Sequence, residues 1–279
     1  IQVLSRIGDE VLVPEPAWPL YREIAEHLGR RYVPLRTSIE DRWTVKSGEL
    51  SKHTTPASKL LVFNYPNNPT GRALSLTELK DLVEEARESS LTIISDEVYS
   101  QYYFHGRYAP SIIQVLDEGY VLVGSFSKTW GMTGYRIGYL VGDKEFIEKA
   151  ARILGLIMTC IPEFIQRAAL KALRDEENVV KNVEEVKKRV RYMYSKLQEN
   201  SLIEVYPSDG AFYLFPRIKI AGFDSSEFAL KLLKEHGVAV APGSGFGEYN
   251  QHIRLSAVKP INEIDEGVEK LNQAIQQTI

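Results

Sequence analysis

A single lysine in a serine- and glycine-rich segment is the residue of this chain best suited to covalent chemistry. Lys128 follows the apolar run Tyr120–Gly124, which is typical of a buried strand. Burying the charge of a lysine at the end of such a strand costs free energy, so a functional role for this lysine is expected. Lysine amines form Schiff bases with carbonyl cofactors, of which pyridoxal phosphate is the commonest.

Donors suited to a phosphate monoester surround this lysine. Ser125 and Ser127 supply hydroxyl groups, and Arg136 supplies a guanidinium that can bind phosphate at two points. The glycines of the segment allow the backbone to turn tightly around a ligand. Taken alone, the segment is equally consistent with an exposed lysine in a Gly/Ser loop, so the rest of the chain must decide.

Three further candidate side chains follow other predicted strands. They are Trp18 after residues 9–14, Asn68 after residues 59–64, and Asp96 after residues 91–95. Ligands of open α/β sheets bind at the carboxyl ends of the strands. We therefore expect these three side chains to converge with Lys128 at one edge of a sheet.

Each of these residues has a chemical interpretation and a purely structural one. Trp18 can stack on a cofactor ring or cap the core, and Asn68 can donate its amide or simply form a turn before Pro69. Asp96 can pair with a protonated pyridine nitrogen or cap a helix. Tyr99, three residues further on, can donate its phenol to a ring oxygen.

An arginine within a later apolar strand also needs an explanation. Arg254 lies in Ile253–Ser256, and a buried guanidinium needs an anion because it cannot lose its charge. A substrate carboxylate and an internal salt bridge are equally consistent with this segment.

The order of elements predicts an α/β fold with two domains. A strand–loop–helix rhythm through residue 142 indicates a mostly parallel sheet with crossover helices. The later part alternates helices with short strands and indicates a smaller α+β domain. We predict a large domain at residues 1–158 and a small domain at residues 159–279.

Three local features complete the expected structure. Residues 37–58 are polar and are expected to form an irregular surface excursion. Thr77 is expected to cap the helix that it begins. Cys160 lies among apolar residues and is expected to be a buried, inert thiol.

Composition excludes several classes of function. The net charge of −3 over 279 residues predicts no nucleic-acid partner, and no apolar run is long enough to cross a membrane. A single cysteine excludes an internal disulfide and indicates a cytoplasmic protein. The five scattered histidines show no metal-ligand spacing, so we predict no metal site.

The motifs together resemble those of the class I/II aminotransferases, which have the fold type I architecture of pyridoxal-phosphate enzymes. The resemblance runs in order from about Gly8 to the C-terminus, and aspartate-aminotransferase-like members fit best. Six segments carry it, namely Pro16–Pro19, Asn67–Gly71, Asp96–Tyr99, Ser125–Gly138, Gly210–Tyr213 and Arg254–Ser256.

This resemblance implies roles for the residues that surround the cofactor ring. Lys128 would form the Schiff base and shuttle the proton, and Asp96 would keep the pyridine nitrogen protonated. Tyr99 and Asn68 would bind the phenolic oxygen of the ring and tune the pKa of the Schiff base. Trp18 would stack on the ring.

The resemblance also implies how phosphate and substrate are bound. Ser125, Ser127 and Arg136 would bind the cofactor phosphate. Arg254 would bind the α-carboxylate of the substrate, with Phe212 near it, and Asn68 would also lie at the substrate.

The expected function is transfer of an amino group between an amino acid and a 2-oxo acid, through ping-pong half-reactions. A pyridoxal-phosphate lyase or synthase on the same scaffold is one alternative. A truncated, catalytically silent relative that serves as a binding module is another. The family implies a homodimer.

Family members carry an N-terminal arm, a tyrosine from the partner subunit and a Gly-rich turn before a helix that caps the phosphate. No counterpart of these precedes Ile1. We therefore predict weak or absent cofactor binding by the 279-residue chain. Titration with pyridoxal phosphate tests this prediction, and a stable absorption band at one equivalent would contradict it.

Overall fold

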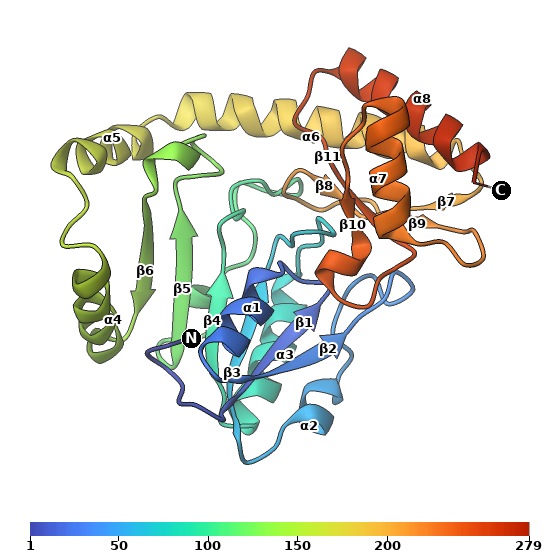
Figure 1. Cartoon of the computed structure of the whole chain (residues 1–279). Coiled ribbons are helices and arrows are strands. Elements are labelled where there is room, and N and C mark those ends of the chain that lie inside the picture. Colours follow the sequence, from blue (N-terminus) through green and yellow to red (C-terminus); the bar gives the residue numbers. More distant parts are fainter. Residues whose placement is uncertain (279) are drawn as a thin grey trace.

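A six-stranded mixed sheet forms the centre of the larger part of the molecule (Figure 1). The computed structural model describes residues 1–278. The strand order is β2-β1-β3-β4-β5-β6, in which β6 alone runs antiparallel to its neighbour. The strands are β1 (Glu10–Glu15), β2 (Arg31–Arg36), β3 (Ser58–Asn64), β4 (Thr92–Asp96), β5 (Tyr120–Ser125) and β6 (Gly138–Gly142). The predicted α/β class with a mostly parallel sheet is confirmed.

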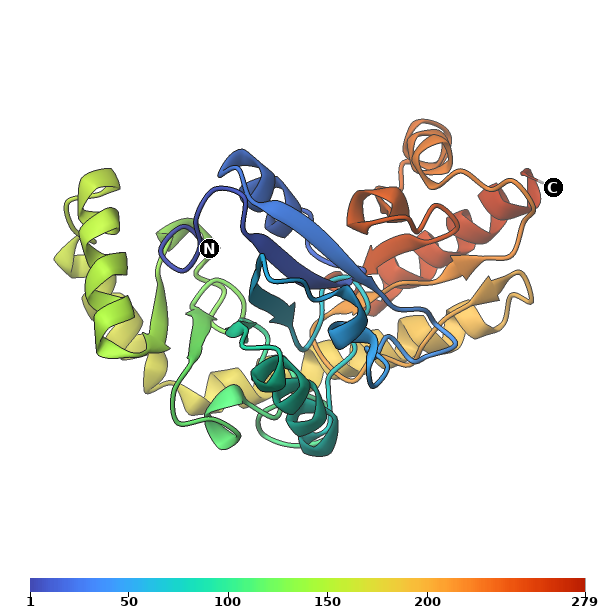
Figure 2. The ribbon, with the colours of Figure 1, turned by 90° about the horizontal axis from the view of Figure 1, so that it is seen from below.

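Helices cover both faces of this sheet, which explains why its inner strands are apolar throughout. Val11 of β1 packs in the cluster that includes Ala25 of α1, whereas the next residue, Leu12, packs in the cluster that includes Leu79 of α3. This alternation follows from the two-residue period of a strand. Figure 2 shows α1 and α3 on opposite sides of the strands. The helices of this part are α1 (Leu20–His27), α2 (Glu49–His53), α3 (Leu76–Glu88) and the 3-10 turns η1 (Ile112–Gln114) and η2 (Thr133–Tyr135).

Three local expectations were wrong. The cap of α3 is Ser75, whose hydroxyl accepts from the Glu78 amide while the Glu78 carboxylate accepts from the Ser75 amide; Thr77 does not cap it. The segment after β2 contains α2 and buries Trp43, so it is more than an irregular excursion. Cys160 is exposed, because the apolar segment around it lies on the surface of the chain.

The C-terminal part builds a second core from helices and short strands. Its two small sheets have the orders β10-β11-β8 and β7-β9, and their pairs are antiparallel. One buried cluster joins α6, α7 and α8, with Leu197, Leu232 and Leu271 among its members. The elements of this part are α6 (Glu176–Gln198), β7 (Ile203–Glu204), β8 (Tyr213–Leu214), β9 (Arg217–Ile218), α7 (Ser225–His236), β10 (Ala241–Pro242), η3 (Gly243–Phe246), β11 (Ile253–Ser256) and α8 (Ile261–Gln276). Two helices precede them, α4 (Lys144–Ile157) and α5 (Glu163–Leu173), and both lie beside β6 (Figure 1).

The long helix α6 connects the two parts of the molecule (Figure 1). Just before it, α5 packs Ala169 in one cluster with Phe126 and Ile137, which belong to the region of β5 and β6. The first helix after residue 158 therefore contacts the larger part of the chain.

The loop after β3 contacts the C-terminal part directly. The Gly71 carbonyl accepts from the amides of Asp209 and Gly210, both at 2.9 Å. The buried Arg72 forms ion pairs with Asp209, at 3.0 Å, and with Glu78, at 2.5 Å. These contacts hold the loop that carries Asn68 against the strand region that carries Arg254.

We predict that Gly71→Ala destabilises the fold by about 3 kcal/mol, because a Cβ adds a clash to an unfavourable backbone conformation. Gly71 has a φ of +72°, and an added Cβ would lie 2.1 Å from Ser208 Oγ and 2.8 Å from the Tyr213 carbonyl oxygen. Denaturant unfolding measures the change. Gly222→Ala is the matched control, since Gly222 has the same φ but nothing within 4 Å. The control should lose only about 1 kcal/mol, and equal losses in both variants would contradict the prediction.

Candidate active site

A cavity of about 390 Å³ lies where the carboxyl ends of the parallel strands meet the C-terminal part. Its lining residues are Trp18, Tyr21, Asn64, Asn68, Asp96, Val98, Tyr99, Ser125, Ser127, Lys128, Thr133, Arg136, Tyr213 and Arg254. The structure thus brings together nine of the ten residues singled out from the sequence. The tenth, Phe212, lines an adjoining cavity that also includes Lys128.

The carboxylate of Asp96 is buried at the end of β4. Its Oδ2 accepts a hydrogen bond of 2.5 Å from the Tyr21 hydroxyl, and its Oδ1 accepts one of 3.3 Å from the Val98 amide. Burial raises the pKa of this carboxyl to about 6, while the Tyr21 hydrogen bond opposes the rise. The carboxylate therefore lies where a cationic partner would stabilise its charged form.

Asn64 connects the ends of two strands to the loop that follows β3. Its amide nitrogen donates to the Asp96 carbonyl at 2.8 Å, and its Oδ1 accepts from the Asn68 amide at 2.9 Å. Asn64 and Tyr21 were not identified from the sequence. Asn64 is a polar residue at the end of an apolar strand, and that signal could have identified it. Tyr21 occupies an apolar position of α1, which hides its polar contact.

Lys128 lines the same cavity as Asp96, Arg136 and Arg254. Burial lowers the pKa of the Lys128 ammonium, and the positive charges of Arg254 and Arg136 lower it further, whereas Asp96 opposes them. Its Nζ lies 5.8 Å from the centre of the Tyr99 ring. Within residues 1–278, the Lys128 ammonium has no carboxylate at ion-pair distance. The amine is thus poised to lose its proton more readily than an exposed lysine.

The segment after β5 folds back on itself beside Lys128. The Ser127 amide donates to Ser125 Oγ at 3.1 Å, and Thr133 Oγ1 donates to the Ser127 carbonyl at 2.9 Å. Arg136 adopts a left-handed backbone conformation with a φ of +54°, and its Nη1 donates to the Thr133 carbonyl at 2.9 Å. The result is a group of hydroxyl and guanidinium donors on one wall of the cavity, as a phosphate requires.

Arg254 reaches the cavity from β11, on the opposite part of the chain. Its Nη1 donates to Asn68 Oδ1 at 3.1 Å, and its guanidinium lies 4.7 Å from the centre of the Tyr213 ring. Its Nε is buried and forms no hydrogen bond within the described residues. In addition, no carboxylate of residues 1–278 lies at ion-pair distance from the Arg254 guanidinium. The geometry therefore favours an external anion over an internal salt bridge.

Aromatic side chains form the remaining walls. The Tyr99 and Tyr213 hydroxyls lie 2.9 Å apart in a hydrogen bond, and burial raises the pKa of Tyr99. Phe212 packs edge-on against Tyr99, with ring centres 5.5 Å apart. Trp18 is 38% exposed and packs edge-on against Tyr21, so one part of its ring is free to meet a ligand.

A comparison with known protein families decides what this arrangement is. The family model "Aminotransferase class I and II" matches residues 1–271. The chain belongs to this family.

Curated relatives and solved structures agree with this family. The chain is 35% identical to aromatic-amino-acid aminotransferase 2 of Thermococcus litoralis and 36% identical to an aspartate aminotransferase of Pyrococcus abyssi. Each match covers 97% of this chain and 71% of the relative. Among solved structures, an aspartate aminotransferase of Thermotoga maritima matches with a TM-score of 0.91 at 30% identity, covering 99% of this chain and 72% of that one.

The protein is thus a pyridoxal-phosphate-dependent aminotransferase, and the enzyme class and cofactor predicted from the sequence are confirmed. The residues present suit that cofactor, since one cavity offers a lysine, a buried carboxylate and a set of phosphate donors. None of the helices in residues 1–278 is long and apolar enough to span a membrane. The same residues contain no group of three or more His, Cys, Asp or Glu side chains that could hold a metal ion.

We predict that Asp96→Asn makes the cofactor-free protein more stable at pH 7 but not at pH 4. The pKa of Asp96 is higher in the folded state than its ordinary 3.8, so the folded protein binds more protons between pH 4 and 6. Wild-type stability therefore falls as the pH rises through this window. The variant lacks the titrating group, so its advantage should grow by roughly 2 to 3 kcal/mol from pH 4 to 7.

Urea unfolding at several pH values measures this difference. Asp117→Asn is the matched control, because Asp117 is exposed and the substitution removes the same charge. The free energy of unfolding of the control should differ from that of the wild type by nearly the same amount at every pH. An Asp96→Asn curve parallel to that of the control would contradict the burial of an ionised carboxylate.

Proposed function

We propose that this aminotransferase moves an amino group between an amino acid and a 2-oxo acid within the 390 Å³ cavity. One observation carries the proposal. Asp96 and Lys128 line the same cavity, and their surroundings shift their pKa values in opposite directions. Paired shifts of this kind are typical of sites that hold and transfer protons. When bound, pyridoxal phosphate supplies the electron sink that this chemistry requires.

Asp96 is proposed to accept a hydrogen bond from the protonated pyridine nitrogen. A cation at this position would stabilise the buried carboxylate and bring its pKa back down. Tyr21 orients the carboxylate through its 2.5 Å hydrogen bond. Asn64 fixes the backbone of Asp96 and so supports the same orientation.

Lys128 is proposed to hold the cofactor covalently and to transfer the proton of the substrate α-carbon. Its lowered pKa increases the fraction of free amine at neutral pH, and a free amine is both a nucleophile and a base. The adjoining cavity on its other side leaves room for the side chain to move between positions.

The remaining roles follow from the donors that each wall offers. Ser125, Ser127 and Arg136 are proposed to bind the phosphate. Tyr99 and Asn68 are proposed to bind the phenolic oxygen of the ring.

Two further residues complete the ring and substrate contacts. Trp18 is proposed to stack on the ring. Arg254 is proposed to bind the substrate α-carboxylate with its unpaired edge, beside Asn68 and Phe212. A guanidinium matches a carboxylate in both charge and shape.

We further propose that the protein works as a homodimer in the cytoplasm. Apolar side chains around the end of α4 are strongly exposed, including Leu156 at 87%, Ile157 at 77% and Phe164 at 69%. A patch of this kind is typical of a protein interface. The single cysteine is consistent with a reducing compartment. We also propose the domain division at residue 158, with α5 packed against the first domain.

Borohydride reduction traps even weakly bound cofactor, so it does not require the tight binding that the sequence argues against. We predict that reduction in excess pyridoxal phosphate attaches the cofactor to Lys128, and that Lys128→Ala abolishes this labelling. Mass mapping of peptides locates the added mass. Lys144→Ala is the matched control, because Lys144 is an exposed lysine at the start of α4, and this variant should be labelled like the wild type. Labelling spread over surface lysines would contradict the proposed role.

Absorption spectra of the same reconstituted protein distinguish the reaction type. An aminotransferase should lose the band of the lysine-bound cofactor on addition of an amino acid and regain it on addition of a 2-oxo acid. Regain without an oxo acid would indicate a lyase or synthase. No response to any amino acid, despite labelling at Lys128, would indicate a catalytically silent relative.

A further inference from the structure

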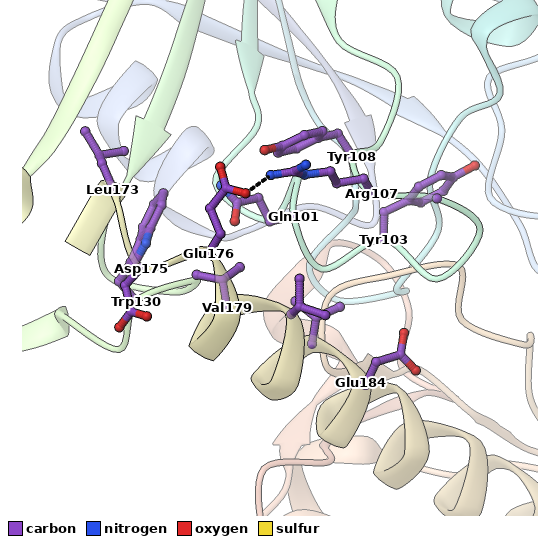
Figure 3. A pocket seen from close by; sticks show the side chains of 13 residues that line it. Gln101, Tyr103, Arg107, Tyr108, Trp130, Leu173, Asp175, Glu176, Val179 and Glu184 are labelled. Carbon is purple, nitrogen blue, oxygen red and sulfur yellow. Dashed lines mark hydrogen bonds and ion pairs between the residues drawn. The ribbon is translucent and has the colours of Figure 1, made fainter. Parts of the chain in front are cut away.

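A second cavity lies between the loop at residues 101–108 and the first turns of α6 (Figure 3). Its volume of about 430 Å³ falls within the range of small-molecule sites. It shares no lining residue with the candidate active site. The known activity therefore assigns no role to it.

Apolar and aromatic side chains form most of its walls. They are Tyr103, Tyr108, Trp130, Leu173, Val179, Val180 and Val183. Three of these side chains are aromatic, and the faces of aromatic rings attract cations, including organic ammonium groups. Arg107 already shows this preference, since its guanidinium lies 5.4 Å from the centre of the Tyr108 ring.

The charged residues that line the cavity give it a net negative charge. Three carboxylates, those of Asp175, Glu176 and Glu184, face a single cation, Arg107. Arg107 Nη2 lies 2.6 Å from Glu176 Oε2, so this pair is neutral, as the dashed line in Figure 3 marks. Glu184 is also paired, because its Oε1 lies 3.5 Å from the Nζ of Lys187, which does not line the cavity. Asp175 accepts hydrogen bonds from Asn178 and has no cation at ion-pair distance within residues 1–278. Its carboxylate leaves a negative charge on the cavity wall, and such a cavity favours positive ligands.

We propose that this cavity binds a small organic cation with an apolar body, such as an alkyl- or aryl-substituted ammonium ion. The body would contact the valines of α6 and the Trp130 ring, and the charge would face the aromatic rings and carboxylates. The cation would also contact the segment that carries the catalytic lysine, because Trp130 lies two residues after Lys128.

Benzyltrimethylammonium is a suitable probe, because it is permanently charged and cannot condense with an aldehyde. Titration calorimetry of the full chain should show saturable binding at one site, with a dissociation constant on the order of 0.1 to 1 mM. Phenylacetate, an anion with a similar ring, should bind at least about tenfold more weakly. Pyridoxal phosphate at saturation should not displace the probe.

Val180→Lys tests the location, because Val180 is 56% exposed and its replacement places a positive charge at the cavity wall without disturbing a core. This variant should bind the probe about tenfold more weakly, whereas the matched Val180→Gln should stay within about twofold of wild type. Glu184→Gln, also exposed, should weaken binding about 2- to 5-fold and gives a second test.

Three results of the binding measurements made without pyridoxal phosphate would overturn the proposal. They are absence of saturable binding, equal affinity for phenylacetate, and unchanged affinity in both Val180→Lys and Glu184→Gln. Circular dichroism of each variant confirms that a loss of binding does not come from a loss of structure. Displacement of the probe by pyridoxal phosphate would place it in the active site and would also reject the second cavity.

Discussion

A carboxylate held inside the protein at the end of β4 is the constraint on which the active site depends. Asp96 is buried, and burial raises its pKa to about 6, so its charge is costly until a cation faces it. Hydrogen bonds from Tyr21 and Asn64 hold this residue in place. The cavity beside the carboxylate is where a protonated ring nitrogen would remove that cost. We therefore expect cofactor binding to raise the free energy of unfolding, because the bound cation stabilises the buried carboxylate of the folded state.

The part built on the six-stranded sheet supplies most of the cavity, and the C-terminal part closes it with Tyr213 and Arg254. The parallel strands bring their carboxyl ends to one edge and so present Asp96 and Lys128, while β11 supplies Arg254 from the other side. The contact between Asn68 and Arg254 joins the two parts, and the buried Arg72 holds the loop of Asn68 against the C-terminal part. The substrate carboxylate would bind at this junction, so substrate binding and the relative position of the two parts are coupled.

Much of the fold and of the site could be predicted from the sequence because strand ends are easy to recognise. Apolar runs identify the strands, and a polar or charged residue at the end of such a run, like Asp96, or shortly after it, like Lys128, is conspicuous. Tyr21 could not be recognised because its helix position looks apolar and only the fold brings its hydroxyl to Asp96. Cys160 was misjudged because its neighbours are apolar, yet they lie on an exposed surface. Local composition indicates which segments are apolar enough to be buried. Whether such a segment is in fact buried depends on the tertiary contacts that cover it.

The most direct test of this account is a crystal structure of the protein grown with a large excess of pyridoxal phosphate, which offsets the weak binding predicted from the sequence. We expect electron density for the ring within the 390 Å³ cavity, continuous with Lys128 Nζ, with the pyridine nitrogen within hydrogen-bond distance of Asp96. The phosphate should lie against Ser125, Ser127 and Arg136. Density for the cofactor at another lysine, or a ring whose nitrogen faces away from Asp96, would contradict the account.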